Sequence, residues 1–148
     1  MANVAKHRVS GKASKAKPDR VVPILLEFLL DEDEEIVYAA MRGLTLIGPQ
    51  ENIMKTLVAL LRDQRQGVRT YAGWQLRELG SAVVPVLVKA LGDKDSELRS
   101  RVAWTLGGMR DRQAEGAMDA LQTATKDSNE DVRTWAAWAL ERINEQSR

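Results

Sequence analysis

The side chains that most often perform catalysis are scarce in this chain of 148 residues. It contains no cysteine and a single histidine, His7. Without cysteine there is no disulfide, thiolate metal site, iron–sulfur cluster or cysteine nucleophile. One histidine, close to the N-terminus, leaves most hydrolase and metalloenzyme designs without a catalytic group. We therefore expect a protein that binds and does not catalyse, with no cofactor.

Acidic side chains provide one candidate metal site, because residues 31–35 read Asp-Glu-Asp-Glu-Glu. A loop that binds a hard cation needs a tight turn and several convergent oxygens, and this stretch has no glycine. Acidic residues are also common at the beginning of a helix, where they interact favourably with the helix dipole. The sequence favours a helix start here over a metal site.

Tryptophans and their neighbours are the best candidates for recognition. Trp74, Trp104 and Trp138 each lie eleven residues after an aspartate, and Arg42 occupies the matching position nearer the N-terminus. Rigid indole rings supply much of the energy at protein binding sites. The candidate binding residues are these four and their polar or aromatic neighbours, Tyr38, Thr70, Arg77, Ser100 and Thr134.

These candidates recur because the chain consists of four repeats. The aligned aspartates are Asp31, Asp63, Asp93 and Asp127, at spacings of 32, 30 and 34 residues. Branched apolar residues follow five positions later, and leucines follow thirteen positions later: Ile36, Val68, Leu98 and Val132, then Leu44, Leu76, Leu106 and Leu140. Apolar positions at i, i+4 and i+8 indicate one face of a helix.

Each repeat is expected to be a pair of helices. Asp33, Asp95 and Asn129 are good N-cap residues for the second helices, and Gly48 and Gly80 stand where a helix would end. A single pair cannot bury its apolar face alone, so the pairs must stack. We expect an all-α, right-handed α-solenoid of four helix pairs, with units at about 19–48, 49–80, 81–112 and 113–145.

Three segments carry a family resemblance. Residues 19–26 read Asp-Arg-Val-Val-Pro-Ile-Leu-Leu, residues 81–88 read Ser-Ala-Val-Val-Pro-Val-Leu-Val, and residues 131–140 read Asp-Val-Arg-Thr-Trp-Ala-Ala-Trp-Ala-Leu. These segments resemble the short HEAT-like repeats of the phycobilisome-lyase type, over about residues 19–145. The resemblance implies a protein interaction scaffold. A few relatives are bilin lyases, and HEAT-like enzymes include a DNA glycosylase and a metal-dependent hydroxylase, but fold similarity does not transfer function.

The tryptophans are expected on the side of the second helices away from the core. With Val68 at zero on a helical wheel, Trp74 falls at about 240°. The resemblance implies that second helices line the concave groove of the solenoid, where these indoles would be anchors. Alternatively, the indoles cover the neighbouring second helix and complete the packing between repeats. Trp135 is expected mainly to pack over the last repeat.

Arginine follows the branched residue in three repeats, at Arg69, Arg99 and Arg133. The pattern permits anion binding. The resemblance favours a ladder of ion pairs instead, in which these arginines bind the aligned aspartates of neighbouring units.

The net charge of +1 divides unevenly along the chain. Residues 1–20 carry +5 and the remainder carries −4. Because few large apolar residues precede Val21, we expect residues 1–18 to form a disordered basic arm on a domain of residues 19–148. The arm is a candidate for weak, salt-sensitive contact with nucleic acid, or for folding back on the acidic helix starts. No apolar stretch approaches the roughly 20 residues of a membrane helix, and a cytoplasmic location is expected.

These features predict a non-catalytic interaction module that binds a peptide or helix of a partner protein in its groove. Two alternatives stay open: a small-molecule or pigment-handling protein similar to bilin lyases, and weak nucleic-acid binding through the basic arm. Self-association as a homo-oligomer through the end repeats also stays open, because open-ended repeats expose apolar faces unless they are capped.

Overall fold

The computed structural model describes residues 17–148, and this part of the chain is helical without any strand. The α-helices are α1 (Pro18–Phe28), α2 (Glu34–Ile47), α3 (Glu51–Leu60), α4 (Gln66–Glu78), α5 (Val84–Ala90), α6 (Ser96–Gly107), α7 (Met118–Ala124) and α8 (Glu130–Gln146). Short 3-10 turns, Gly80–Val83 and Glu115–Ala117, precede α5 and α7. The predicted basic arm, apart from its last two residues, lies outside the described residues, and so does His7.

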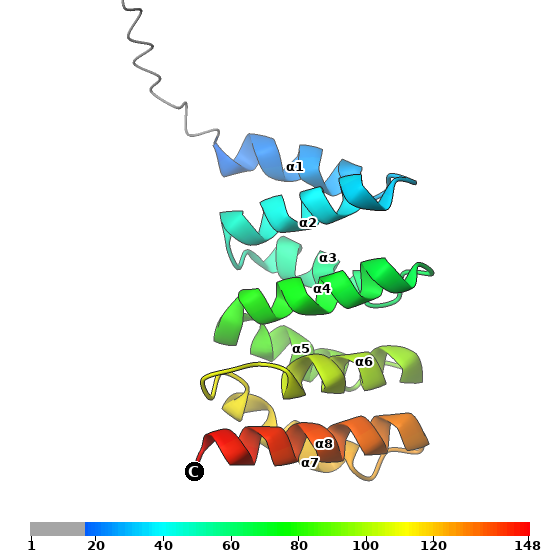
Figure 1. Ribbon diagram of the computed structural model, residues 1–148, viewed down its shortest axis with the longest axis vertical. Helices are drawn as coiled ribbons and strands as arrows, with labels where there is room; N and C mark the ends of the chain where they lie inside the picture. Colours follow the sequence, from blue (N-terminus) through cyan, green and yellow to red (C-terminus); the bar gives the residue numbers. More distant parts are fainter. Residues whose placement is uncertain (1–16) are drawn as a thin grey trace, which may run out of the picture.

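The helices form stacked antiparallel pairs, α1 with α2, α3 with α4, α5 with α6, and α7 with α8. Helix α2 packs on α4, α4 on α6 and α6 on α8, so the second helices make one continuous layer (Figure 1). Helices α3, α5 and α7 lie behind that layer. The expected all-α solenoid is confirmed.

Local side chains begin the second helices where the sequence predicts. The Asp33 carboxylate accepts a hydrogen bond from the Glu35 backbone N–H at 2.9 Å, and the Asp95 carboxylate accepts one from Glu97 at 3.0 Å. The Asn129 side chain accepts from the Val132 N–H at 3.1 Å. These bonds satisfy backbone donors that have no partner within the helix.

The aligned aspartates have a role that their spacing alone did not reveal. Oδ1 of each one accepts a hydrogen bond from the backbone N–H two residues later, at 2.8 Å in the first repeat and 2.9 Å in the other three. The four are Asp31, Asp63, Asp93 and Asp127. This local bond is the Asx turn. The repeated aspartate therefore folds the loop that joins the two helices of each unit.

The predicted ladder between units is confirmed at one position. Arg99 donates from Nε and Nη2 to the two carboxylate oxygens of Asp127 in the next unit, both at 2.9 Å. Elsewhere the predicted partners are wrong. Asp63 is paired with Arg65 of its own loop, and Asp93 is paired with Arg62.

The repeated arginines share a different set of bonds. Nη1 of each donates to two backbone carbonyls of the loop before its own helix. For Arg69 these are Asp63 and Gln64, at 2.7 and 2.8 Å. Arg99 and Arg133 make the same pair of bonds in their own units. These arginines therefore bind their own loops, whether or not they also pair with a carboxylate of the next unit.

The first repeat departs from the aligned pattern in its core. The alignment places Ile36 at the core position, yet Ile36 is 38% exposed and its neighbour Val37 is fully buried. In the other three repeats the aligned residue is buried, at 0% for Val68 and Val132 and 1% for Leu98, whereas α1 and α2 form the first pair of the described stack and no unit covers their N-terminal side. Exposed large apolar residues accordingly gather in this repeat, at Ile24, Phe28, Leu30, Ile36 and Leu46.

Candidate functional site

The candidate binding residues all lie on the layer of second helices. We call the outward side of α2, α4, α6 and α8 the second-helix surface. Its members from the sequence are Tyr38 and Arg42 on α2, Thr70, Trp74 and Arg77 on α4, Ser100 and Trp104 on α6, and Thr134 and Trp138 on α8. Three hollows on this surface are lined by Trp74 or Trp104.

Trp74 is the most exposed of the three aligned tryptophans, with 51% of its surface open to solvent. Its ring lies 6.3 Å from that of Tyr71, and the Tyr71 ring lies 4.8 Å from that of Tyr38. These rings form an aromatic row across α2 and α4. A hollow of about 480 Å³ borders the row, and it also contains Arg42.

Tyr38 carries a perturbed phenol at one end of this row. Its hydroxyl donates a hydrogen bond to the Glu34 carboxylate one turn earlier on α2. The bond to Glu34, with partial burial and the nearby negative charges, raises the pKa of Tyr38 to about 12. The phenol therefore stays neutral at physiological pH, and its hydroxyl proton is committed to Glu34.

Trp104 and Trp138 serve the packing between repeats as well as the surface. The Trp104 ring covers Gly73 of the preceding unit so closely that a Cβ there would lie 2.7 Å from Cζ3. Trp138 covers Gly107 in the same manner, and a Cβ at Gly107 would overlap its ring. Both side chains remain partly accessible. Each indole therefore has one edge in the stack and presents the rest to the second-helix surface.

Arg77 joins two repeats. Its guanidinium lies 3.9 Å from the centre of the Trp104 ring and donates to the backbone carbonyls of Trp104 and Thr105, at 3.0 and 3.2 Å. Burial lowers the pKa of this guanidinium, which still remains far above neutrality. Because Arg77 binds the C-terminal carbonyls of α6, it holds Trp104 in place.

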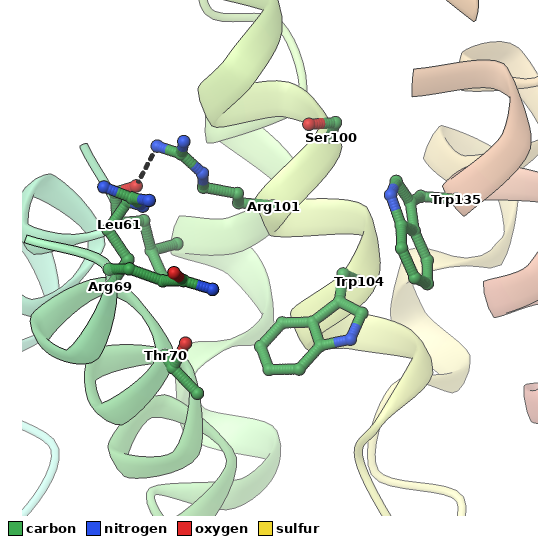
Figure 2. A pocket seen from close by; sticks show the side chains of 8 residues that line it. Leu61, Arg69, Thr70, Ser100, Arg101, Trp104 and Trp135 are labelled. Atoms are coloured by element: carbon green, nitrogen blue, oxygen red, sulfur yellow. Dashed lines mark hydrogen bonds between the residues drawn. The ribbon is translucent and has the colours of Figure 1, made fainter. Parts of the chain in front are cut away.

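Thr70 and Ser100 line a hollow between α4, α6 and α8, of about 250 Å³ (Figure 2). Sequence reasoning did not place Arg69, Arg101 and Trp135 in it. Trp135 is 37% exposed and meets Trp138 edge to face at 5.4 Å, so it packs on the last repeat as expected and also forms a wall of this hollow. Thr134 is exposed on α8.

A sequence signal for this hollow does exist. Tyr71, Arg101 and Trp135 share one position in the repeat, eight residues after the aligned aspartate. That position lies about one turn before the aligned tryptophans, Trp74, Trp104 and Trp138. Large side chains that recur at two positions one turn apart indicate a surface wider than a single column.

Among residues 17–148, no cluster of three or more His, Cys, Asp or Glu side chains is arranged to hold a metal ion. The acidic run at residues 31–35 instead forms the loop and first turn of α2 described above. None of the helices in the same range combines the length and apolar character needed to cross a membrane.

Comparison with known proteins identifies the repeat. Residues 53–141, more than half of the chain, match the family model for HEAT repeats. The chain belongs to the HEAT repeat family. This agrees with the paired helices, the aligned aspartates and the continuous core that the structure shows. No curated protein matches the chain.

Solved structures show similar solenoids. One is the CpcE–CpcF complex of phycocyanin lyase from Nostoc sp. PCC7120, at 19% identity and a TM-score of 0.55, covering 86% of this HEAT repeat chain and 80% of that one. Another is human deoxyhypusine hydroxylase in complex with glycerol, at 29% identity and a TM-score of 0.58. The similarity covers 84% of this chain but only 43% of the hydroxylase.

Proposed function

We propose that the second-helix surface binds a helical or extended segment of another protein, with Trp74, Trp104 and Trp138 as anchors. HEAT repeat solenoids are typical of protein-interaction scaffolds, and this chain has that fold. The observation that carries the proposal is that the hollows between neighbouring second helices are bordered by tryptophans from the same position of the repeat. Such a series of hollows fits successive side chains of one segment.

Most of the binding energy is expected at Trp74. Half of its indole is exposed, and Tyr71 supports it from one side. An exposed indole in a ready-made hollow gains by being covered, because aromatic rings bury a large apolar area at small conformational cost. Trp104 and Trp138 already use one edge for packing between repeats and offer less new area.

The proposed function is non-catalytic. The similarity to the phycocyanin lyase complex, at 19% identity, supports the fold and carries no pigment chemistry to this chain. The hydroxylase similarity covers less than half of that enzyme, so its activity is not transferred either. The hollows beside Trp104 and Trp74 are lined by indoles, guanidiniums, hydroxyls, amides and, in the hollow beside Trp74, the carboxylate of Glu78, a composition suited to recognition.

Peptide selection tests this proposal. Peptides selected from a random display library on the wild-type protein would be measured by fluorescence anisotropy against Trp74→Ala. We expect binding to weaken by about 30-fold, the loss of about 2 kcal/mol typical of an aromatic anchor. Circular dichroism and thermal melting should be close to wild type, because Trp74 is half exposed.

Leu30→Ala is the matched control, because Leu30 is a large apolar residue that is 86% exposed and lies away from the second-helix surface. It should leave peptide binding unchanged. Equal affinity of the selected peptides for the wild type and Trp74→Ala would refute the proposal. Loss of binding in Leu30→Ala alone would place the binding face at the N-terminal end of the stack.

A further inference from the structure

The hollow in Figure 2 carries positive charge, which the aligned tryptophans do not explain. Its eight lining residues come from three repeats: Leu61, Gln66, Arg69, Thr70, Ser100, Arg101, Trp104 and Trp135. Two of them carry guanidinium groups and none carries a carboxylate. Trp104 and Trp135 border one side of the hollow, and Arg69 and Arg101 lie on the other (Figure 2).

Both guanidiniums are held in place by backbone carbonyls, that of Arg101 at the C-cap of α3 and that of Arg69 in the loop between α3 and α4. Arg101 donates from Nη1 to Leu61 O of the preceding repeat, at 2.7 Å. Arg69 donates from Nη1 to Asp63 O and Gln64 O, at 2.7 and 2.8 Å. The carbonyl end of a helix is a favourable place for cations. The two guanidiniums therefore line the same hollow and are held by the backbone before any ligand arrives.

Each guanidinium keeps donors for a ligand. A guanidinium has five N–H groups, arranged to match a carboxylate. Among residues 17–148, the bonds of Arg69 all come from Nη1 or its backbone, which leaves Nε and Nη2. Arg101 uses Nη1 for Leu61 and Nη2 for Glu97, at 3.1 Å. Glu97 itself is 74% exposed and outside the lining, so an entering carboxylate can replace it.

The size of the hollow indicates what enters. About 250 Å³ lies below the roughly 300–1,000 Å³ of sites that enclose a drug-sized molecule. It suits one or two side chains of a segment that continues along the second-helix surface. The guanidiniums require an anionic group, and the indoles require an apolar or aromatic group beside it.

We propose that this hollow binds an acidic side chain and an adjoining aromatic side chain of a partner segment. The carboxylate lies between Arg69 and Arg101, and the aromatic ring lies against Trp104 and Trp135. This inference rests on the proposed function and names the chemistry of the partner. Positive charge without a lining carboxylate selects acidic segments over basic ones, by electrostatic complementarity.

Two short peptides test the assignment with the full chain. One carries Glu-Phe-Glu at the centre of a glycine-serine sequence, and the other carries Gln-Phe-Gln in the same frame. The chain has four tryptophans, and nuclear magnetic resonance spectra would follow their indole N–H signals during titration. The acidic peptide should shift the Trp104 and Trp135 signals in a saturable manner. It should bind about tenfold more tightly than the amide peptide, with weakening as salt is added.

Variants locate the acidic contact. Arg101→Gln should weaken the acidic peptide about tenfold, whereas Glu97→Gln should strengthen it because Arg101 loses a competing carboxylate. Arg62→Gln is the matched control, since Arg62 lines a different hollow beside α3 and α5. If Arg101→Gln unfolds, Ser100→Glu places a carboxylate inside the hollow and should block the acidic peptide in a folded protein.

Several outcomes would overturn the assignment. Equal affinities for the two peptides would show that the hollow does not discriminate between a carboxylate and an amide. A larger loss with Arg62→Gln than with Arg101→Gln would place the anion beside α3 and α5. Shifts confined to Trp74 would place the aromatic side chain elsewhere on the surface. If these tests fail but the selected peptides still need Trp74 for binding, the hollow has no preference for acidic segments. The proposed function then stands without that preference.

Discussion

Replacing Arg99 by methionine removes a guanidinium that binds two parts of the stack. It bonds both carboxylate oxygens of Asp127 in the next repeat and two carbonyls of its own loop. The two side chains are only 12% and 14% exposed. Loss of one partner from a buried ion pair costs about 3–5 kcal/mol, so we expect Arg99→Met to cost about 3 kcal/mol at this partial exposure.

Arg69→Met is an internal control. Arg69 makes the same two carbonyl bonds in its own loop, and the structure of residues 17–148 shows no ion pair between it and the next repeat. Its replacement should cost about 1 kcal/mol, the value of modest hydrogen bonds near solvent. The difference of about 2 kcal/mol isolates the bridge between Arg99 and Asp127.

Urea unfolding followed by circular dichroism measures the loss of stability in both variants. In thermal melts, the difference of about 2 kcal/mol between them should appear as roughly 6 °C in melting temperature. The hydrogen bonds from Arg99 hold the pKa of Asp127 below its ordinary value. A carboxyl group with a lowered folded pKa stabilises the protein above its unfolded pKa, about 3.9, and loses that contribution as the pH falls. The gap between the variants should therefore narrow in acid. Equal losses at neutral pH would refute this account of the bridge.

Three other predictions concern single positions. Gly107→Ala should destabilise the protein by about 1–2 kcal/mol in thermal melts because a Cβ there overlaps the Trp138 ring, whereas Gly116→Ala, with only ordinary contacts, should be nearly neutral. Spectrophotometric titration should show Tyr38 ionising near pH 12, and Glu34→Gln should bring that pKa down toward the ordinary value of about 10. Gly80→Ala should lose about 1 kcal/mol in urea titrations because Gly80 has a φ of +69°.

Much of the fold was predictable because its signals are local. Asp33, Asp95 and Asn129 each bond a backbone N–H within the next three residues, so their function does not depend on the rest of the chain. The positive φ angles of Gly48 and Gly80 follow from the same helix-end logic. The apolar period of 3.6 residues then required the pairs to stack.

The candidate site was predictable only in part. The sequence placed Trp74 on the outward side of its helix, and the structure shows it half exposed there. The same reasoning predicted the same exposure for Trp104. In the structure the Trp104 ring instead packs between Gly73 and the guanidinium of Arg77. Arg101 was missed because its partner, Leu61 O, is 40 residues away in the chain.

By itself, the sequence determined the repeat, the helix pairs, the caps and the outward position of the tryptophans, because each depends on residues within one or two helical turns. Tertiary structure decided how the repeats meet. It buried Val37 in place of Ile36, paired Arg99 with Asp127, and brought Arg69 and Arg101 to one hollow. The two arginine contacts join residues about one repeat apart. They therefore depend on the rotation and offset between stacked units, which no periodicity within a single repeat specifies.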